Sequence, residues 1–153
     1  MTHYSSKHGT VSRPQAELFM VFTDPRNITR MLPADKLGEV SADYDSVSIK
    51  AQGITISARI TRREPYSYIE LRSENAPFDF TVGLHFDYAG PASTEFYIEV
   101  DADLNFMMKM MLGNKLQEAL DRVVDSLVDI SNGKIPDDIP QDLRDKMNFR
   151  EHK

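Results

Sequence analysis

The chain has 153 residues, a formal net charge of −6 and no cysteine. The negative charge argues against a nucleic-acid-binding protein, because phosphate binding depends on clustered lysine and arginine. The lack of cysteine excludes disulfides, thiolate nucleophiles and cysteine-based metal sites. A hydrophobic content of 41% and a charged content of 27% are ordinary for one globular domain with a substantial core.

The N-terminal sequence MTHYSSKHGT lacks the apolar segment of a signal peptide. No apolar run in the chain approaches the length needed to span a bilayer. We therefore expect a cytoplasmic protein that does not span a membrane.

The chain begins with a predicted strand and a short helix. Residues 3–11 are polar and compatible with a strand. Ser12-Arg-Pro-Gln15 combines a capping-box spacing with a proline in the first turn, which predicts a helix start. Phe19 and Met20 are expected on the buried side of this helix.

A second short helix is predicted by the same logic. Asp24 supplies the cap and Pro25 the first helical position, and the helix should run to a stop at Pro33.

Residues 36–104 predict a series of strands without a helix. Six strands are expected near residues 37–42, 45–51, 54–63, 66–73, 77–88 and 93–104. The last two alternate strictly between apolar and polar residues, so one face of each should be buried and the other wet. The predicted inward residues of these two strands are Phe78, Phe80, Val82, Leu84, Phe86 and Tyr88, and then Phe96, Ile98, Val100, Ala102 and Leu104.

One long amphipathic helix is predicted from about Leu104 to Asn132. Its apolar residues recur at helical spacing, at Leu112, Leu116, Ala119, Leu120, Val123, Leu127 and Ile130. Asp103 or Asn105 can cap its start, and Gly133 marks its end. Strands followed by such a helix predict an α+β fold, in which a curved antiparallel seven-stranded sheet is covered by the long helix and carries two short helices.

The first two turns of the long helix differ from the rest. Residues 106–112, FMMKMML, are apolar nearly all round, so they should be covered on two sides or face a cavity. Methionine is flexible and polarizable, and it often contacts irregular apolar partners. Ordinary core filling and ligand contact both explain this segment.

The order of elements resembles the helix-grip fold of the START-like (SRPBCC) superfamily. The segment Val11-Ser-Arg-Pro-Gln-Ala-Glu-Leu-Phe19, with Thr23-Asp24-Pro25 and Met31-Leu32-Pro33, is similar to the N-terminal pattern of many bacterial members. The resemblance covers about residues 2–134, which predicts a domain over 1–134 and a partly flexible extension over 135–153. It implies an apolar cavity between sheet and helix that often takes a lipid, sterol or polyketide-like molecule. Some members are carriers, some are enzymes and some bind proteins, so function does not follow from the fold.

Candidate ligand-binding residues are those expected to line such a cavity. They are Phe80, Val82, Leu84, Phe96, Ile98, Val100, Met107, Met108, Met111 and Leu112. Tyr68 and Arg72 lie opposite Ile69 and Leu71 in the predicted register. They become polar anchors for a ligand only if that register is reversed.

The remaining polar residues indicate no catalytic or metal site. His85 should point to solvent, because its neighbours Leu84 and Phe86 point inward. No histidine pair has the spacing of metal ligands, and no cofactor is expected. Arg59, Arg62 and Arg63 are interpreted as solvated charge.

The favoured hypothesis is therefore binding of a hydrophobic small molecule or lipid without catalysis. The first alternative is a protein–protein interaction module that uses the Met-rich helix end or the C-terminal extension. The second is a cyclase-like or hydrolase-like enzyme, which requires Tyr68, Arg72 or another polar group inside the cavity.

Overall fold

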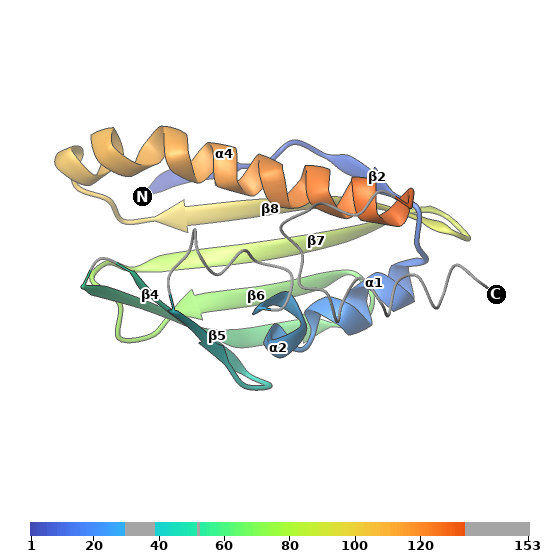
Figure 1. Cartoon of the computed structure of the whole chain (residues 1–153), viewed down its shortest axis with the longest axis horizontal. Coiled ribbons are helices and arrows are strands. Elements are labelled where there is room, and N and C mark those ends of the chain that lie inside the picture. Colours follow the sequence, from blue (N-terminus) through green and yellow to red (C-terminus); the bar gives the residue numbers. More distant parts are fainter. Residues whose placement is uncertain (30–38, 52, 134–153) are drawn as a thin grey trace.

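A curved antiparallel sheet with helices on its inner face forms the protein (Figure 1). The structure is a computed structural model, and it describes residues 1–29, 39–51 and 53–133. The strands are β1 (Thr2–Ser5), β2 (Gly9–Val11), β3 (Glu39–Ala42), β4 (Ser46–Ala51), β5 (Ile54–Glu64), β6 (Tyr68–Ser73), β7 (Phe80–Gly90) and β8 (Ser93–Ala102). The helices are α1 (Gln15–Phe22), α2 (Pro25–Thr29) and α4 (Phe106–Ser131).

The strands follow the order β1-β8-β7-β6-β5-β4-β3, and β2 also pairs with β8. The described part of the sheet is open rather than closed into a barrel, because β1 and β3 lie at its two ends. This arrangement confirms the predicted α+β helix-grip architecture.

The predicted alternation in β7 and β8 is confirmed. Leu84 is paired with Ile98 and Phe86 with Phe96, and all four side chains are buried on the inner face. Because side chains alternate along a strand, His85 lies on the outer face, as predicted. Tyr88, also predicted inward, is instead 69% exposed, where β7 approaches the hairpin to β8.

The single strand predicted over residues 3–11 is divided in two, so the sheet has one strand more than predicted. Ser5 pairs with Glu99, whereas Gly9 pairs with Phe96, so the pairing with β8 shifts by one residue. Ser6 occupies the interruption, where its backbone N–H donates to the carbonyl of Ile98 and its hydroxyl accepts from the Ile98 N–H.

The predicted capping box at residues 12–15 is wrong. Helix α1 begins at Gln15 with Pro14 before it, and no side chain caps it. The Ser12 hydroxyl bonds to Asn132 at the far end of α4, and the Gln15 amide donates to the carbonyl of Phe86. These partners are distant in sequence, so local spacing could not show them. Met20 is also 61% exposed rather than buried.

The start of α2 is confirmed, because Asp24 accepts a hydrogen bond from the backbone N–H of Arg26 and Pro25 is the first helical residue. The described part of the helix reaches Thr29. The predicted continuation to Pro33 lies outside the described residues.

A β-bulge in β5 redirects the arginines of that strand. The pairing with β6 shifts between Ile60 and Arg62, so Arg63 pairs with the inward-facing Ile69. The Arg63 guanidinium donates to the hydroxyl and carbonyl of Thr23 and to the carbonyl of Tyr44. Arg63 therefore joins β5 to α1 and is not the solvated charge that was predicted.

Helix α4 packs against β1, β2 and β8 along one side of the sheet (Figure 1). Asn105 caps it, since the Asn105 side chain accepts a hydrogen bond from the Met108 N–H. Leu120, Val124 and Leu127 are its buried apolar residues. Among the helices of the described residues, none has the length and apolar character required to cross a membrane.

Candidate functional site

Near α1, the inner face of the sheet is filled by an aromatic cluster. Phe19 and Phe22 of α1 pack against Phe86 and Phe96, with ring centroids 5.2–6.0 Å apart for the contacts between helix and strands. Phe86 and Phe96 have no exposed surface. Aromatic contacts of this kind add to the stabilisation from burial, so this end of the inner face is a packed core.

The opposite end of the inner face is only partly covered. Phe78, Phe80 and Val82 are half-buried and pack against the core, and Met108 of α4 is half-buried and packs against the same core. The Phe78 and Phe80 rings lie 5.6 Å apart. We call this set of four residues the apolar rim. Their side chains pack against the core and remain partly accessible.

Thr2 lies on the inner face beyond the rim. It pairs with Ala102 of β8, which in turn pairs with Phe80 of β7, so the three residues form one row across the sheet. The Thr2 hydroxyl oxygen is buried and has no hydrogen-bond partner among the described residues. A buried hydroxyl without a partner is costly, so this atom can accept or donate a bond to a polar group that enters the row.

The ten predicted lining residues fall into three groups. Leu84, Phe96, Ile98 and Val100 are buried in the core, with exposed fractions of 6% or less. Phe80, Val82 and Met108 belong to the apolar rim. Met107, Met111 and Leu112 are exposed, by 69%, 65% and 37%.

The prediction that the first two turns of α4 are covered or face a cavity is therefore wrong for most of their side chains. Figure 1 shows the reason, because α4 begins beyond the end of β8 and only later lies over the sheet. Phe106 and Met110 are 78% and 72% exposed as well.

Tyr68 and Arg72 lie on the outer face, and Ile69 and Leu71, which lie between them in the strand, are buried. The predicted register of this strand is thus confirmed. Arg72 pairs with Glu70, with its Nε 3.0 Å from the carboxylate. Neither residue can reach a ligand on the inner face.

A row of stacked rings crosses the outer face of the sheet. The His85 ring is parallel to that of Tyr97, with centroids 4.4 Å apart, and His8 stacks on the other face of Tyr97 at 3.9 Å. Tyr68 lies 4.9 Å from His85 at a tilt of 48°. Sequence reasoning missed this row, although the alternation in β7 and β8 places His85 and Tyr97 on one face.

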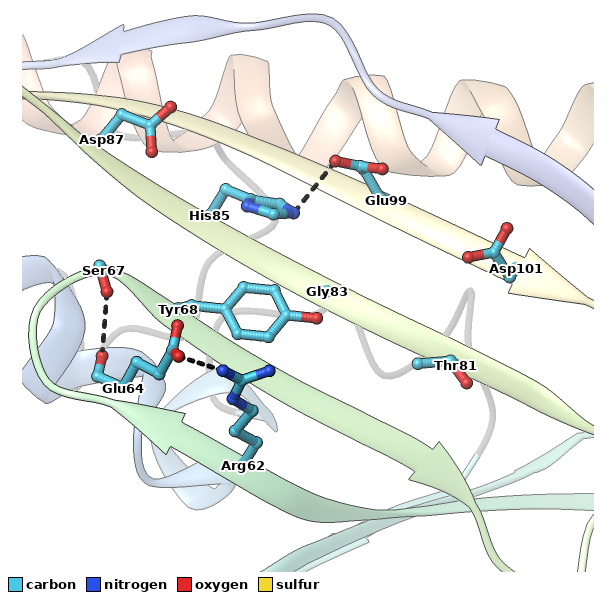
Figure 2. Close-up of a pocket in the computed structure, with 10 residues that line it drawn as sticks. All are labelled: Arg62, Glu64, Ser67, Tyr68, Thr81, Gly83, His85, Asp87, Glu99 and Asp101. Carbon is cyan, nitrogen blue, oxygen red and sulfur yellow. Dashed lines mark hydrogen bonds and ion pairs between the residues drawn. The ribbon is translucent and has the colours of Figure 1, made fainter.

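Beside the row is an open hollow of about 440 Å³ (Figure 2). Gly83 forms its floor, where a Cβ atom would lie 3.0 Å from the Tyr68 ring and hydroxyl. His85 is paired with Glu99, its Nε2 3.1 Å from the carboxylate. The walls carry four carboxylates, on Glu64, Asp87, Glu99 and Asp101.

Burial and pairing shift several pKa values on this outer face. Burial, with the negative charge of Glu70 next, raises the pKa of Tyr68, and burial likewise raises that of Tyr97. Burial would raise the pKa of Glu70, but hydrogen bonds from Thr61 and Arg72 outweigh it and lower that pKa below its usual value.

The hollow is polar, open and mainly acidic, with Arg62 as its one arginine and His85 already paired with Glu99. Such a lining disfavours an anionic ligand, and it does not provide the apolar surface that a lipid requires. Within residues 1–29, 39–51 and 53–133, no three His, Asp or Glu side chains are grouped so that they could hold a metal ion.

No protein-family model matches the sequence, and no characterised protein matches it in sequence. Solved structures resemble it in fold. A START superfamily protein from Mycobacterium smegmatis is 15% identical, with a TM-score of 0.54 over 82% of this chain and 98% of that one. The Aha1 dimer from Colwellia psychrerythraea is 9% identical, with a TM-score of 0.58 over 84% and 97%. A protein from Thermobifida fusca is 11% identical, with a TM-score of 0.63 over 84% and 91%.

At these identities the likeness concerns the fold and not the activity. It agrees with the sheet order, the inner-face core and the long final helix described above. The chain therefore has the helix-grip fold of START-like proteins.

Proposed function

We propose that the chain binds a hydrophobic small molecule or lipid at the apolar rim, on the inner face of the sheet, without converting it. The observation that carries this proposal is the partial exposure of Phe78, Phe80, Val82 and Met108 at the edge of an otherwise packed core. An apolar ligand laid against these side chains would remove their remaining surface from water. Burial of apolar surface contributes about 25 cal/mol per Å², which is the main driving force for such binding.

The row from Phe80 through Ala102 to Thr2 indicates the kind of ligand. Ala102 contributes only a methyl group, and beyond it lies the unpartnered hydroxyl of Thr2. A ligand with an apolar body and one carbonyl or hydroxyl group would match the rim and this hydroxyl together. Ligand sites generally have this composition, a mostly apolar lining with a few polar groups that fix orientation.

The absence of conversion is proposed from the position of the polar residues. The enzyme hypothesis required Tyr68, Arg72 or another polar group on the inner face. Tyr68 and Arg72 lie on the outer face, and the polar group beyond the rim is the hydroxyl of Thr2. Catalysis by proton transfer needs a group within hydrogen-bond reach of the reacting atoms. Thr2, a weak acid and base, is a better anchor than catalyst.

The test combines native mass spectrometry of the freshly purified full chain with titration of an apolar fluorescent dye, anilinonaphthalene sulfonate. Val82→Trp would fill the rim, and Thr81→Trp, its neighbour on the outer face, is the matched control. We expect Val82→Trp to weaken dye binding at least tenfold and Thr81→Trp to leave it unchanged. Absence of a retained apolar molecule together with equal dye binding by both variants would overturn the proposal.

A further inference from the structure

The first two turns of α4 present an apolar surface that no described element covers. Phe106, Met107, Met110 and Met111 are between 65% and 78% exposed, although they are among the most apolar residues of the helix. We call these four residues the apolar tip of α4. They lie where the helix begins beyond the end of β8, so the tip projects from the body of the protein (Figure 1).

The four side chains form one surface on the helix. With 3.6 residues per turn, Phe106, Met110, Met107 and Met111 follow one another around an arc of about 140°. Lys109 lies on one side of this arc and Lys115 on the other by the same geometry, and both are exposed. An apolar arc flanked by lysines is the pattern of a helix that lies in a lipid–water interface, where the lysines reach the headgroups.

The distribution of charge supports an anionic partner. Residues 104–117 include two of the 18 basic residues of the chain and none of its 24 acidic ones. The rest of the chain is therefore more acidic than its net charge of −6 indicates. Asp103 precedes this segment and Glu118 follows it, so the excess of positive charge is confined to the tip itself. Fixed charges are screened over about 8 Å at physiological ionic strength, so the more distant acidic residues of the body act weakly on a surface that the tip contacts.

We propose that the apolar tip of α4 docks on an anionic lipid surface, with the four apolar side chains at the acyl boundary and Lys109 and Lys115 at the headgroup phosphates. Only the tip contacts the surface. With 3.6 residues per turn, Glu118, Asp121 and Asp125 follow on the same side of α4, and their carboxylates keep the rest of the helix away from the anionic headgroups. This inference does not depend on a ligand at the apolar rim. It uses side chains on another part of the molecule.

The experiment is sedimentation of the full-length protein with vesicles of phosphatidylcholine alone or with roughly 30 mol% phosphatidylglycerol. We expect binding to the anionic vesicles that weakens with added salt, and little binding to the neutral ones. Lys109→Gln with Lys115→Gln should lower the partition coefficient roughly thirtyfold, at about fivefold per lysine. Met107→Ser with Met111→Ser should lower it at least tenfold.

Two matched controls separate the tip from general effects. Met20→Ser removes a methionine of α1 that is 61% exposed, and Lys50→Gln removes an exposed lysine of β4. Both should bind vesicles like the unmodified chain, and all variants should keep its melting temperature within a few degrees. Equal binding of all variants, or no binding to anionic vesicles, would overturn the proposal. Concentration-dependent dimerisation that the Met107→Ser, Met111→Ser variant abolishes, without vesicle binding, would assign the tip to self-association instead.

Discussion

At the scale of single residues, the contact between β2 and α4 depends on Gly9. A Cβ atom at this position would lie 2.6 Å from Val124 Cγ1 and 2.8 Å from Val128 Cγ2. Real side chains do not approach so closely, and Val124 is fully buried, so it has little room to move. The absence of a side chain at residue 9 therefore allows α4 to lie directly on β2.

We predict that Gly9→Ala destabilises the protein by about 1–3 kcal/mol, because overpacking forces side chains or backbone to shift. Chemical denaturation of the two proteins measures the difference. Thr10→Ala, on the exposed neighbouring residue, is the control and should stay within about 0.5 kcal/mol. A stable Gly9→Ala variant would mean that α4 can move away from β2 at little cost.

At the scale of elements, α4 is held at both ends in different ways. At its C-terminal end, the Ser131 hydroxyl accepts from the Ser12 N–H, and the Arg13 guanidinium donates to the Ser131 carbonyl. At its N-terminal end, the described partners are fewer, and the Asn105 cap holds the first turn.

We predict that Asn105→Ala destabilises the first turns of α4 by about 1 kcal/mol, as loss of a capping side chain usually does. The loss should be local, since the first turn lies beyond the sheet. Amide hydrogen exchange should therefore accelerate over residues 106–112 and stay unchanged near Val124. Asn105→Asp, which keeps a capping oxygen, should restore protection, and uniform acceleration along α4 would contradict the local character of the effect.

The sheet and the long helix could be predicted from local patterns in the sequence. The alternation around Leu84 and Ile98, and the helical spacing around Leu120 and Leu127, predicted the two layers and the faces that meet. These patterns are local, and burial of one face follows from them directly.

Features that depend on distant partners could not be predicted. Arg63 faces α1 because of a one-residue bulge in β5. The Ser12 hydroxyl bonds to Asn132 at the end of α4 and does not cap the start of α1. The Met-rich turns of α4 are exposed because the helix starts beyond the end of β8. The spacing of apolar residues predicts a helix but does not show where that helix begins relative to the sheet. The apolar rim combines Phe80 and Val82, which the alternation placed on the inner face, with Met108, one of the methionines expected to line a cavity.

At the scale of the whole molecule, stability should depend on pH at both extremes. Backbone N–H groups, first that of Asp45, lower the pKa of Asp43, and the pKa of Glu70 is lowered as described above. A lowered folded-state pKa means that protonation favours the unfolded chain, so this contribution is present above the usual carboxyl pKa near 4 and is lost as the pH falls further. The raised pKa values of Tyr68 and Tyr97 act oppositely, and their contribution is lost as the pH rises above about 10.

The loss of stability at low pH is better tested at Glu70 than at Asp43. The Glu70 carboxylate accepts hydrogen bonds from Thr61, Tyr68 and Arg72, and its side chain is only 15% exposed. We predict that Glu70→Gln lowers the free energy of unfolding by about 1 kcal/mol at pH 7, because the neutral Gln amide has only one accepting oxygen in place of the two charged oxygens of Glu70. The difference should shrink as the pH falls below about 4, where the wild-type carboxylate becomes protonated and loses its advantage. Urea denaturation between pH 7 and pH 3 measures the two curves, with Glu118→Gln on the exposed side of α4 as the control. Parallel curves for the wild type and Glu70→Gln would show that this network on the outer face does not set the acid stability of the fold.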